Sequence, residues 1–214
     1  MPERYRVAVI GRTGRGNYGH GLDTAWLDEP RIEIVAVADD DKVGLAAAAK
    51  RCGVEKTYLD YRKMLDETKP DIVAICSRWI DKHFEMAMEA AERGMHVYME
   101  KPFVRTLVEA DKLVEACQMR HVRLGVGHPT QYSPRLQTIK QLIADGKIGQ
   151  LLELRGRGKE DRRGGGEDLW VLGTHVMDML VSIGGKPSWC SAEILQEGSS
   201  ITKGDVYEGN EGLG

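Results

Sequence analysis

Apolar residues in the first half of the chain occur in short, nearly continuous runs that are rich in β-branched side chains. Such runs are typical of strands covered on both faces, as in an open parallel sheet. Between the runs, apolar residues recur at helical spacing, as at Phe84, Ala87, Met88 and Ala91. The predicted strands are residues 6–10, 32–38, 58–59, 72–76, 97–99 and 122–126.

Start and stop signals frame the segments between these strands as helices. Asp41 is a predicted N-cap for a helix over residues 43–51, which Gly53 ends. Thr106 and Glu109 have the spacing of a capping box before another apolar helix face. Strands and helices that alternate with short links predict an α/β fold, a doubly wound parallel sheet of the Rossmann type, over residues 1–125.

The pattern changes after Gly127, where we expect an incomplete α+β substrate domain over residues 126–214. Ser133 and Pro134 open a predicted helix, and residues 151–155 read as a strand. Residues 156–166 are glycine-rich and basic, which fits either a plain linker or a loop that closes over substrate. Thr174 is a predicted N-cap within the apolar segment 168–184.

A glycine-rich turn follows the first predicted strand and matches a dinucleotide fingerprint in two registers. The first register uses Gly11, Thr13 and Gly16; the second uses Gly14, Gly16 and Gly19, three residues later. We favour the first register. It has threonine at the position of the second glycine, and Gly14 next to it would relieve the crowding that the Thr13 side chain causes. In both, small residues let backbone N–H groups approach a pyrophosphate at the N-terminus of a following helix.

Three adjacent carboxylates close the second predicted strand. An acidic residue at this place accepts hydrogen bonds from the adenosine ribose, and Asp39 is the candidate. Asp41 can cap the next helix and leave Asp39 free for this role. The carboxylates would repel a 2′-phosphate, which favours NAD, whereas Arg12 and Arg15 keep NADP open.

Glu100, Lys101 and Pro102 follow the fifth predicted strand. A residue before proline favours extended backbone, so Lys101 should project from the strand end, where open parallel sheets bind ligands. The alternative is a solvated Glu–Lys pair.

Downstream, His175 falls in the first turn of the helix that Thr174 would cap, where the helix dipole favours a neutral imidazole. Asp178 shares its face; with no third ligand in the sequence, no metal site is predicted.

Composition narrows the classes of partner. The 214 residues are 42% hydrophobic and 29% charged with a net charge of −3, which gives no reason to expect nucleic acid or a membrane surface. No apolar run approaches the roughly 20 residues that span a bilayer. The first residues have no apolar region followed by a cleavage site, so we expect no secretory leader, and the four cysteines are scattered. We therefore expect a cytoplasmic protein with reduced thiols.

With these motifs assembled, the chain resembles the Gfo/Idh/MocA family of NAD(P)-dependent oxidoreductases. The resemblance rests on the glycine turn, the acidic end of the second strand, Glu-Lys-Pro at 100–102 and the Gly-x-His-x-x-Asp pattern at 173–178. The family usually has aspartate where Val171 stands and arginine where Gln131 stands. The resemblance implies catalytic roles for Lys101 and His175, substrate binding by Glu100, Asp168 and Asp178, and cofactor binding by Gly11, Thr13, Gly14, Gly16, Asp39 and Pro102.

The activity implied by the resemblance is hydride transfer between NAD(P) and a secondary alcohol of a sugar, sugar acid or cyclitol. The partner would then be a small polyol or sugar, and the full-length form would be a homo-oligomer. Two alternatives stay open. One is an NAD-dependent glycoside hydrolase of the same family. The other is a nucleotide-binding remnant or truncated fragment without turnover, because family members are considerably longer than this chain.

Overall fold

The computed structural model describes residues 4–158 and 168–205. They fall into two compact units, the first ending at Gly127 and the second beginning at His128, and each is described by itself. Among the described residues, no helix is both long and apolar enough to cross a bilayer. The assignment of the units to nucleotide and substrate binding stays a prediction.

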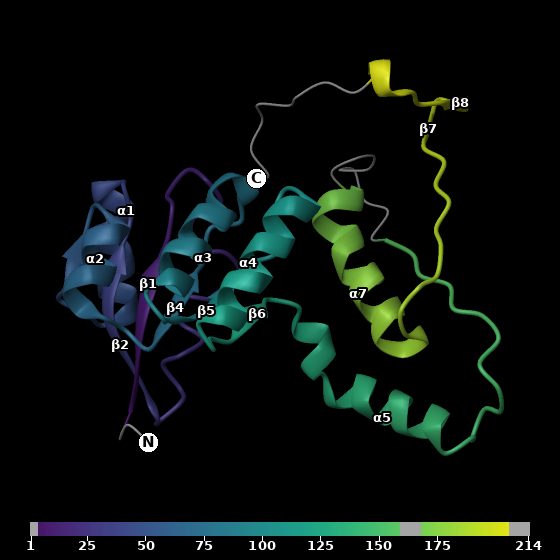
Figure 1. Ribbon diagram of the computed structural model, residues 1–214, viewed down its shortest axis with the longest axis horizontal. Coiled ribbons are helices and arrows are strands. Elements are labelled where there is room, and N and C mark those ends of the chain that lie inside the picture. The colour runs from purple at the N-terminus through teal and green to yellow at the C-terminus, as the bar shows by residue number, and fades with distance from the viewer. Residues whose placement is uncertain (1–3, 159–167, 206–214) are drawn as a thin grey trace. The chain divides into compact units, whose positions relative to one another are not determined.

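A six-stranded sheet organises the first unit (Figure 1). Its strands are β1 (Tyr5–Ile10), β2 (Ile32–Ala38), β3 (Thr57–Tyr58), β4 (Ile72–Ile75), β5 (His96–Met99) and β6 (Leu124–Val126). All five strand pairs are parallel, and the order is β3-β2-β1-β4-β5-β6. The chain winds outward from β1 in both directions, so the order reverses between β1 and β4, and the predicted doubly wound Rossmann sheet is confirmed.

Side chains that alternate along each strand feed two cores, one on each face of the sheet. From β1, Ala8 and Ile10 pack with residues of α2 (Tyr61–Thr68), α3 (His83–Glu92) and α4 (Leu107–Met119). Val7 and Val9 face the other core, which contains Leu45 of α1 (Lys42–Cys52) and Tyr18. Both faces of the sheet are therefore covered, as the continuous apolar runs predict.

Three of the predicted helix signals act as capping residues in the structure. Asp41 caps α1, with its carboxylate accepting the Gly44 N–H at 2.7 Å, and Gly53 ends that helix at φ +68°. Thr106 caps α4 by accepting the Glu109 N–H at 3.1 Å. The capping box is only half formed, because the Glu109 carboxylate accepts the N–H of Arg105 rather than that of Thr106.

The helix expected after the glycine turn is absent, and residues 11–31 form successive turns instead. Gly14, Gly16, Gly19 and Gly21 all have φ between +64° and +88°, and a right-handed helix cannot contain such residues. Tyr18 occupies the space beside the turn. A Cβ on Gly11 would lie 2.2 Å from its ring, so glycine is required there for packing.

The second unit is mainly helical. It contains the 3-10 turn Pro129–Tyr132, α5 (Pro134–Ala144), a π-helical turn (Asp168–Leu172), α7 (Gly173–Gly184), the hairpin β7 (Leu195–Gln196) and β8 (Ser199–Ser200), and the 3-10 turn Lys203–Asp205. Pro134 begins α5 as predicted, although the Ser133 side chain makes no capping bond.

The strand predicted over residues 151–155 is wrong, since these residues pair with no strand in the described chain. Apolar alternation gives no strand without a partner for its backbone groups. The described part of the basic segment, residues 156–158, is irregular, and residues 159–166 of that prediction lie outside the described chain.

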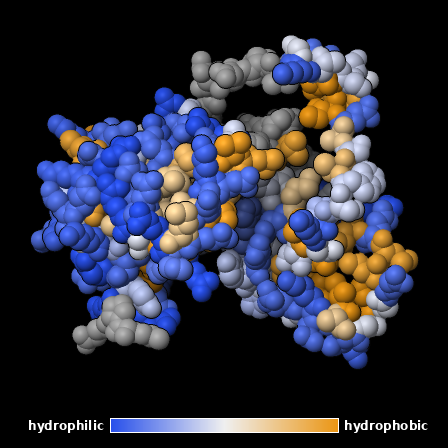
Figure 2. Space-filling view, in the orientation of Figure 1, coloured by the Kyte–Doolittle hydropathy of each residue, from blue (hydrophilic) through white to orange (hydrophobic). Residues whose placement is uncertain are grey.

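Figure 2 shows apolar side chains gathered over α5 and α7, where Ile139, Leu142, Met177 and Val181 are 43–55% exposed.

Candidate functional site

The glycine turn, defined here as residues 11–21, lies against the segment that follows β4. A Cβ on Gly16 would come within 2.5 Å of the Arg78 nitrogen, so the two backbones approach closely. The Arg12 guanidinium pairs with Asp81 at 2.7 Å. Arg15 lies 4.3 Å from the centre of the Trp79 ring. These contacts bridge the carboxyl ends of β1 and β4, where the strand order reverses.

Asp39 holds the glycine turn in place. Its carboxylate is 2% exposed and accepts the Thr13 N–H at 3.0 and 3.1 Å, the Thr13 hydroxyl at 2.8 Å and the Asp41 N–H at 3.0 Å. Asp41 caps α1 as predicted, so Asp39 has no capping role, but its oxygens are already hydrogen-bonded to Thr13 and to the Asp41 N–H. A buried carboxylate needs hydrogen-bond donors, and Thr13 supplies two of them from the neighbouring strand end.

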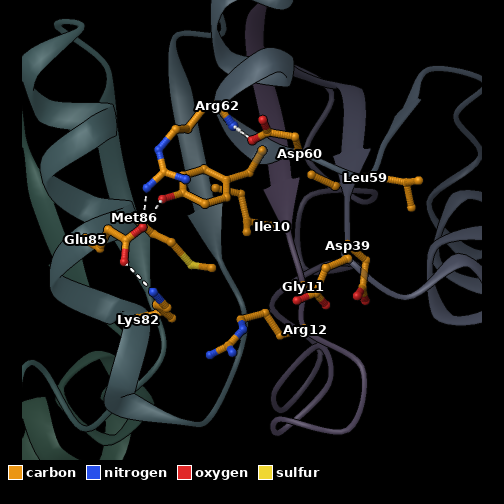
Figure 3. A pocket seen from close by; sticks show the side chains of 13 residues that line it. Ile10, Gly11, Arg12, Asp39, Leu59, Asp60, Arg62, Lys82, Glu85 and Met86 are labelled. Carbon is orange, nitrogen blue, oxygen red and sulfur yellow. Dashed lines mark hydrogen bonds and ion pairs between the residues drawn. The ribbon is translucent and has the colours of Figure 1, made fainter.

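A cleft of about 250 Å³ opens beside Asp39 (Figure 3). One wall carries Gly11, Arg12 and Asp39, and the other carries Lys82, Glu85 and Met86 from the beginning of α3 and the turn before it, with Arg62 of α2 beside them. The hydrogen bond from Lys82, together with those from Arg62 and Tyr61, lowers the pKa of Glu85 to about 2. Its carboxylate is therefore ionised at neutral pH.

The cleft fits part of a dinucleotide. Its volume is slightly below the roughly 300–1,000 Å³ of whole ligand pockets, so it suits a nucleoside better than a complete NAD. It lies at the carboxyl ends of β1 and β2, and carboxylate acceptors and cationic donors surround it. Sequence reasoning missed Arg62 and Lys82. The signal was available, because both follow strands that end at this edge of the sheet.

The lysine turn, defined as residues 100–103, follows β5 and is buried at its start. Glu100 is 1% exposed and Lys101 4%, which excludes the alternative of a solvated pair. Glu100 accepts the backbone N–H of His20 at 2.8 Å and that of Lys101 at 3.1 Å, and His20 Nδ1 lies 3.0 Å from the same carboxylate. Pro102, which follows a cis peptide bond, is also buried.

The two turns pack directly on each other. A Cβ on Gly19 would lie 2.3 Å from the Glu100 carboxylate and 2.6 Å from the carbonyl oxygen of Cys76. His20, which the sequence gave no reason to select, contacts Glu100 through both its backbone and its ring. The structure thus brings together the glycine turn, Asp39 and the lysine turn at one edge of the sheet.

The remaining predicted residues lie in the second unit. Thr174 is not an N-cap, because the helix begins earlier with the π-helical turn and the Thr174 hydroxyl donates to the Val171 carbonyl at 3.3 Å. His175 is therefore not in the first turn of a helix capped by Thr174, contrary to the prediction from the sequence. His175 packs edge-on against His128, with ring centres 5.4 Å apart.

Asp178 accepts a hydrogen bond from the Gln131 amide, so two segments of the second unit meet at this carboxylate. Gln131 stands where the family usually has arginine, and a neutral amide partner leaves the negative charge of Asp178 uncompensated by this contact. The side chain of Asp168 lies outside what the structure describes. Among the described residues, no three metal-ligating side chains converge.

The parallel sheet, the glycine turn at its switch point and the carboxylate at the end of β2 define a nucleotide-binding Rossmann protein. Residues 5–128 match the model of the oxidoreductase family with an NAD-binding Rossmann fold, Gfo/Idh/MocA. The chain belongs to this family.

Relatives of known activity are only moderately similar. D-apiose dehydrogenase of Paraburkholderia graminis is 33% identical over 147 residues, which cover 69% of this chain and 38% of that protein. Levoglucosan dehydrogenase of Pseudarthrobacter phenanthrenivorans is 28% identical over 236 aligned positions, covering 95% of this chain and 60% of that protein. The crystal structure of an NAD binding oxidoreductase from Klebsiella pneumoniae superposes with a TM-score of 0.71 at 28% identity, over 85% of this chain and 53% of that one. The chain thus spans about half the length of such relatives.

Proposed function

We propose that this protein takes part in reversible hydride transfer between NAD and a secondary alcohol of a sugar, sugar acid or cyclitol. The observation that carries the proposal is the buried Glu100–Lys101 pair at the carboxyl end of β5. It lies at the same sheet edge as the glycine turn and Asp39. The Lys101 amine at that edge can bind the alcohol oxygen: in its neutral form it accepts the hydroxyl proton during oxidation, and as the ammonium it returns that proton to the carbonyl oxygen in the reverse direction. NAD, when bound, supplies the hydride chemistry.

The proposed roles follow the sequence motifs. Lys101 and His175 move protons. Glu100, Asp168 and Asp178 bind substrate hydroxyls, and Gly11, Thr13, Gly14, Gly16, Asp39 and Pro102 form the cofactor site. To bind the ribose hydroxyls, Asp39 must either release the hydrogen bonds that it accepts from Thr13 or accept from Thr13 and the ribose at the same time.

We favour NAD over NADP because the cations around the cleft already have carboxylate partners. A 2′-phosphate would have to displace one of these partners and would also meet Asp39 and Asp40. The pairs are Arg12 with Asp81, Lys82 with Glu85, and Arg62 with both Glu85 and Glu89.

The four cysteines, Cys52, Cys76, Cys117 and Cys190, are all free thiols. Free thiols, three of them buried, support a reducing compartment, and we propose the cytoplasm. We also propose that the full-length form is a homo-oligomer.

Calorimetric titration of the purified protein with NAD and NADP tests the cofactor assignment. We expect binding of NAD to be tighter than that of NADP. A panel of polyols, sugars and sugar acids, assayed for NADH formation, then tests the reaction. Binding with cleavage of nitrophenyl glycosides and no net NADH would replace the dehydrogenase with a hydrolase. Binding without any turnover would support a nucleotide-binding remnant, and failure to bind either nucleotide would overturn the proposal.

A further inference from the structure

His83, the first residue of α3, is completely buried at the carboxyl edge of the sheet. Its Nε2 lies 2.7 Å from the carbonyl oxygen of Ser77, which follows β4. Its Nδ1 lies 2.8 Å from the carbonyl oxygen of Pro102 and 3.2 Å from that of Phe103. One imidazole thus joins the end of β4 to the backbone immediately after Lys101.

Both ring nitrogens face groups that only accept hydrogen bonds. A neutral imidazole has one N–H and one lone pair, so at one of these contacts a lone pair would face a carbonyl oxygen within 2.8 Å. That contact is repulsive and leaves the acceptors on one side of the ring without a donor. Only the doubly protonated ring donates at both positions.

His96 provides the opposite case in the same sheet. Its Nδ1 accepts the Arg123 N–H at 2.9 Å, so this nitrogen carries no proton in the structure. The hydrogen-bond partners therefore assign different protonation states to the two histidines.

We infer that His83 is a buried imidazolium that positions the lysine turn. By donating to carbonyls on both sides, it fixes the backbone from which Lys101 projects. The inference about Lys101 rests on the proposed function, whereas the protonation state does not. A misplacement of about 1 Å at a reacting group can lower turnover about 100-fold, so this anchoring has a measurable consequence.

Some features around His83 disfavour a positive charge on the ring, and others favour it. The N-terminus of α3 disfavours a cation, and burial of a charge is costly. In favour of the charge, the carbonyl oxygens of Ser77, Pro102 and Phe103 lie 2.7–3.2 Å from the ring nitrogens, and their dipoles attract a cation. Titratable groups near its end of these elements include Asp81, Lys82 and Glu85; Cys76 at β4; Glu100 and Lys101 after β5; Tyr61 and Arg62 on α2; and Arg105 and Glu109 at α4.

Nitrogen NMR of ¹⁵N-histidine-labelled protein tests the protonation state without any assay of activity. At pH 7.5, where a free imidazole is largely neutral, both nitrogens of His83 should give protonated signals. His96 should show one unprotonated nitrogen. The spectrum of His83→Gln assigns the signals. If that variant does not fold, substitution of the other five histidines one at a time, beginning with His20 beside Glu100, assigns the His83 signals by elimination. A spectrum in which every histidine has one unprotonated nitrogen overturns the inference.

Turnover per NAD-binding site tests the positioning role in an active form of the protein. His83→Leu, which removes both donors, should lower kcat about 10- to 100-fold with little change in NAD affinity. His83→Gln, which keeps one donor group, should fall between the wild type and His83→Leu, and His96→Gln should leave kcat unchanged. Counting active sites by NAD titration separates this effect from a loss of folded protein. An unchanged kcat in His83→Leu overturns the positioning role even if the imidazolium is observed.

Discussion

The glycine turn and the lysine turn lie at the same edge of one sheet and differ in how they are held. The lysine turn begins with buried residues, and its backbone is bonded to His83 and to the carboxylate of Glu100. The glycine turn has exposed residues at Gly14 and Arg15 and replaces the expected helix. Its shape depends on side chains elsewhere, above all Asp39.

The difference shows which kind of turn can be predicted from neighbouring residues in the sequence. A short turn that leaves a buried strand has few conformations, because its neighbours on the adjacent strand restrict it. A turn rich in glycine has many, since each glycine reaches positive φ at little cost. The partner that satisfies its polar groups then decides among them. In this chain the partner is Asp39, which sequence reasoning had reserved for the ribose.

Replacing the ammonium of the lysine turn should have the largest effect. In an active form of the protein, Lys101→Ala should lower turnover by about 100- to 10,000-fold, because a positioned proton-transfer group is lost. NAD affinity, measured by calorimetry, should change little. Lys63→Ala, at an exposed position on α2, is the control. Unchanged turnover in Lys101→Ala would remove this residue from the mechanism.

Two glycines of the glycine turn distinguish packing from backbone strain. Gly19→Ala should lower the free energy of unfolding by about 3 kcal/mol, because its Cβ would meet Glu100 and the Cys76 carbonyl as well as a strained φ. Gly14 also has a positive φ, but a Cβ there would have no other atom within 4 Å. Gly14→Ala should therefore lower the free energy of unfolding by only about 1 kcal/mol. Urea unfolding measures both. Equal losses would contradict close packing between the two turns.

Removing the hydroxyl that binds Asp39 should have a smaller effect. Thr13→Val keeps the side-chain shape and removes one hydrogen bond to a buried carboxylate, so we expect a loss of about 1.5 kcal/mol in unfolding free energy. Thr24→Val, whose hydroxyl makes only a 3.4 Å contact with the Gly21 carbonyl, should cost less than about 0.5 kcal/mol. If the two variants are equally stable, the Thr13 hydroxyl does not help Asp39 to hold the glycine turn.

The smallest predicted effect concerns acid stability at the cleft beside the glycine turn. Because the pKa of Glu85 is lowered to about 2, its ionised form stabilises the fold above the unfolded pKa, near 4.3. This stabilisation should disappear as the pH falls from about 4.3 to 2. Glu85 is 36% exposed, so the contribution should stay below about 1 kcal/mol.

Unfolding of Glu85→Gln as a function of pH measures this contribution. The variant should show a shallower loss of stability between pH 4.3 and 2 than the wild type. Glu92→Gln, on the same helix and without an ion pair in the described part of the chain, should follow the wild-type profile. A parallel profile for Glu85→Gln would mean that its ion pairs do not act in solution.

The spacing of apolar residues, together with capping and turn residues, determined most of the secondary structure of the first unit. The six strands appear within about two residues of the predicted ranges, and Asp41, Gly53 and Thr106 act as predicted. These features depend on neighbours in sequence, such as an apolar run or a cap within three residues of its target. The place of Lys101 at the end of a buried strand follows from the same local information.

Tertiary structure alone decided the contacts between segments far apart in the chain. Thr13 lies 26 residues from Asp39, and His20 lies 80 residues from Glu100. Likewise, residues 151–155 form no strand and Thr174 caps no helix, because a strand needs a partner and a helix can begin earlier in a π-turn. A polar side chain has several possible partners of similar free energy, and burial selects among them only when the chain has folded.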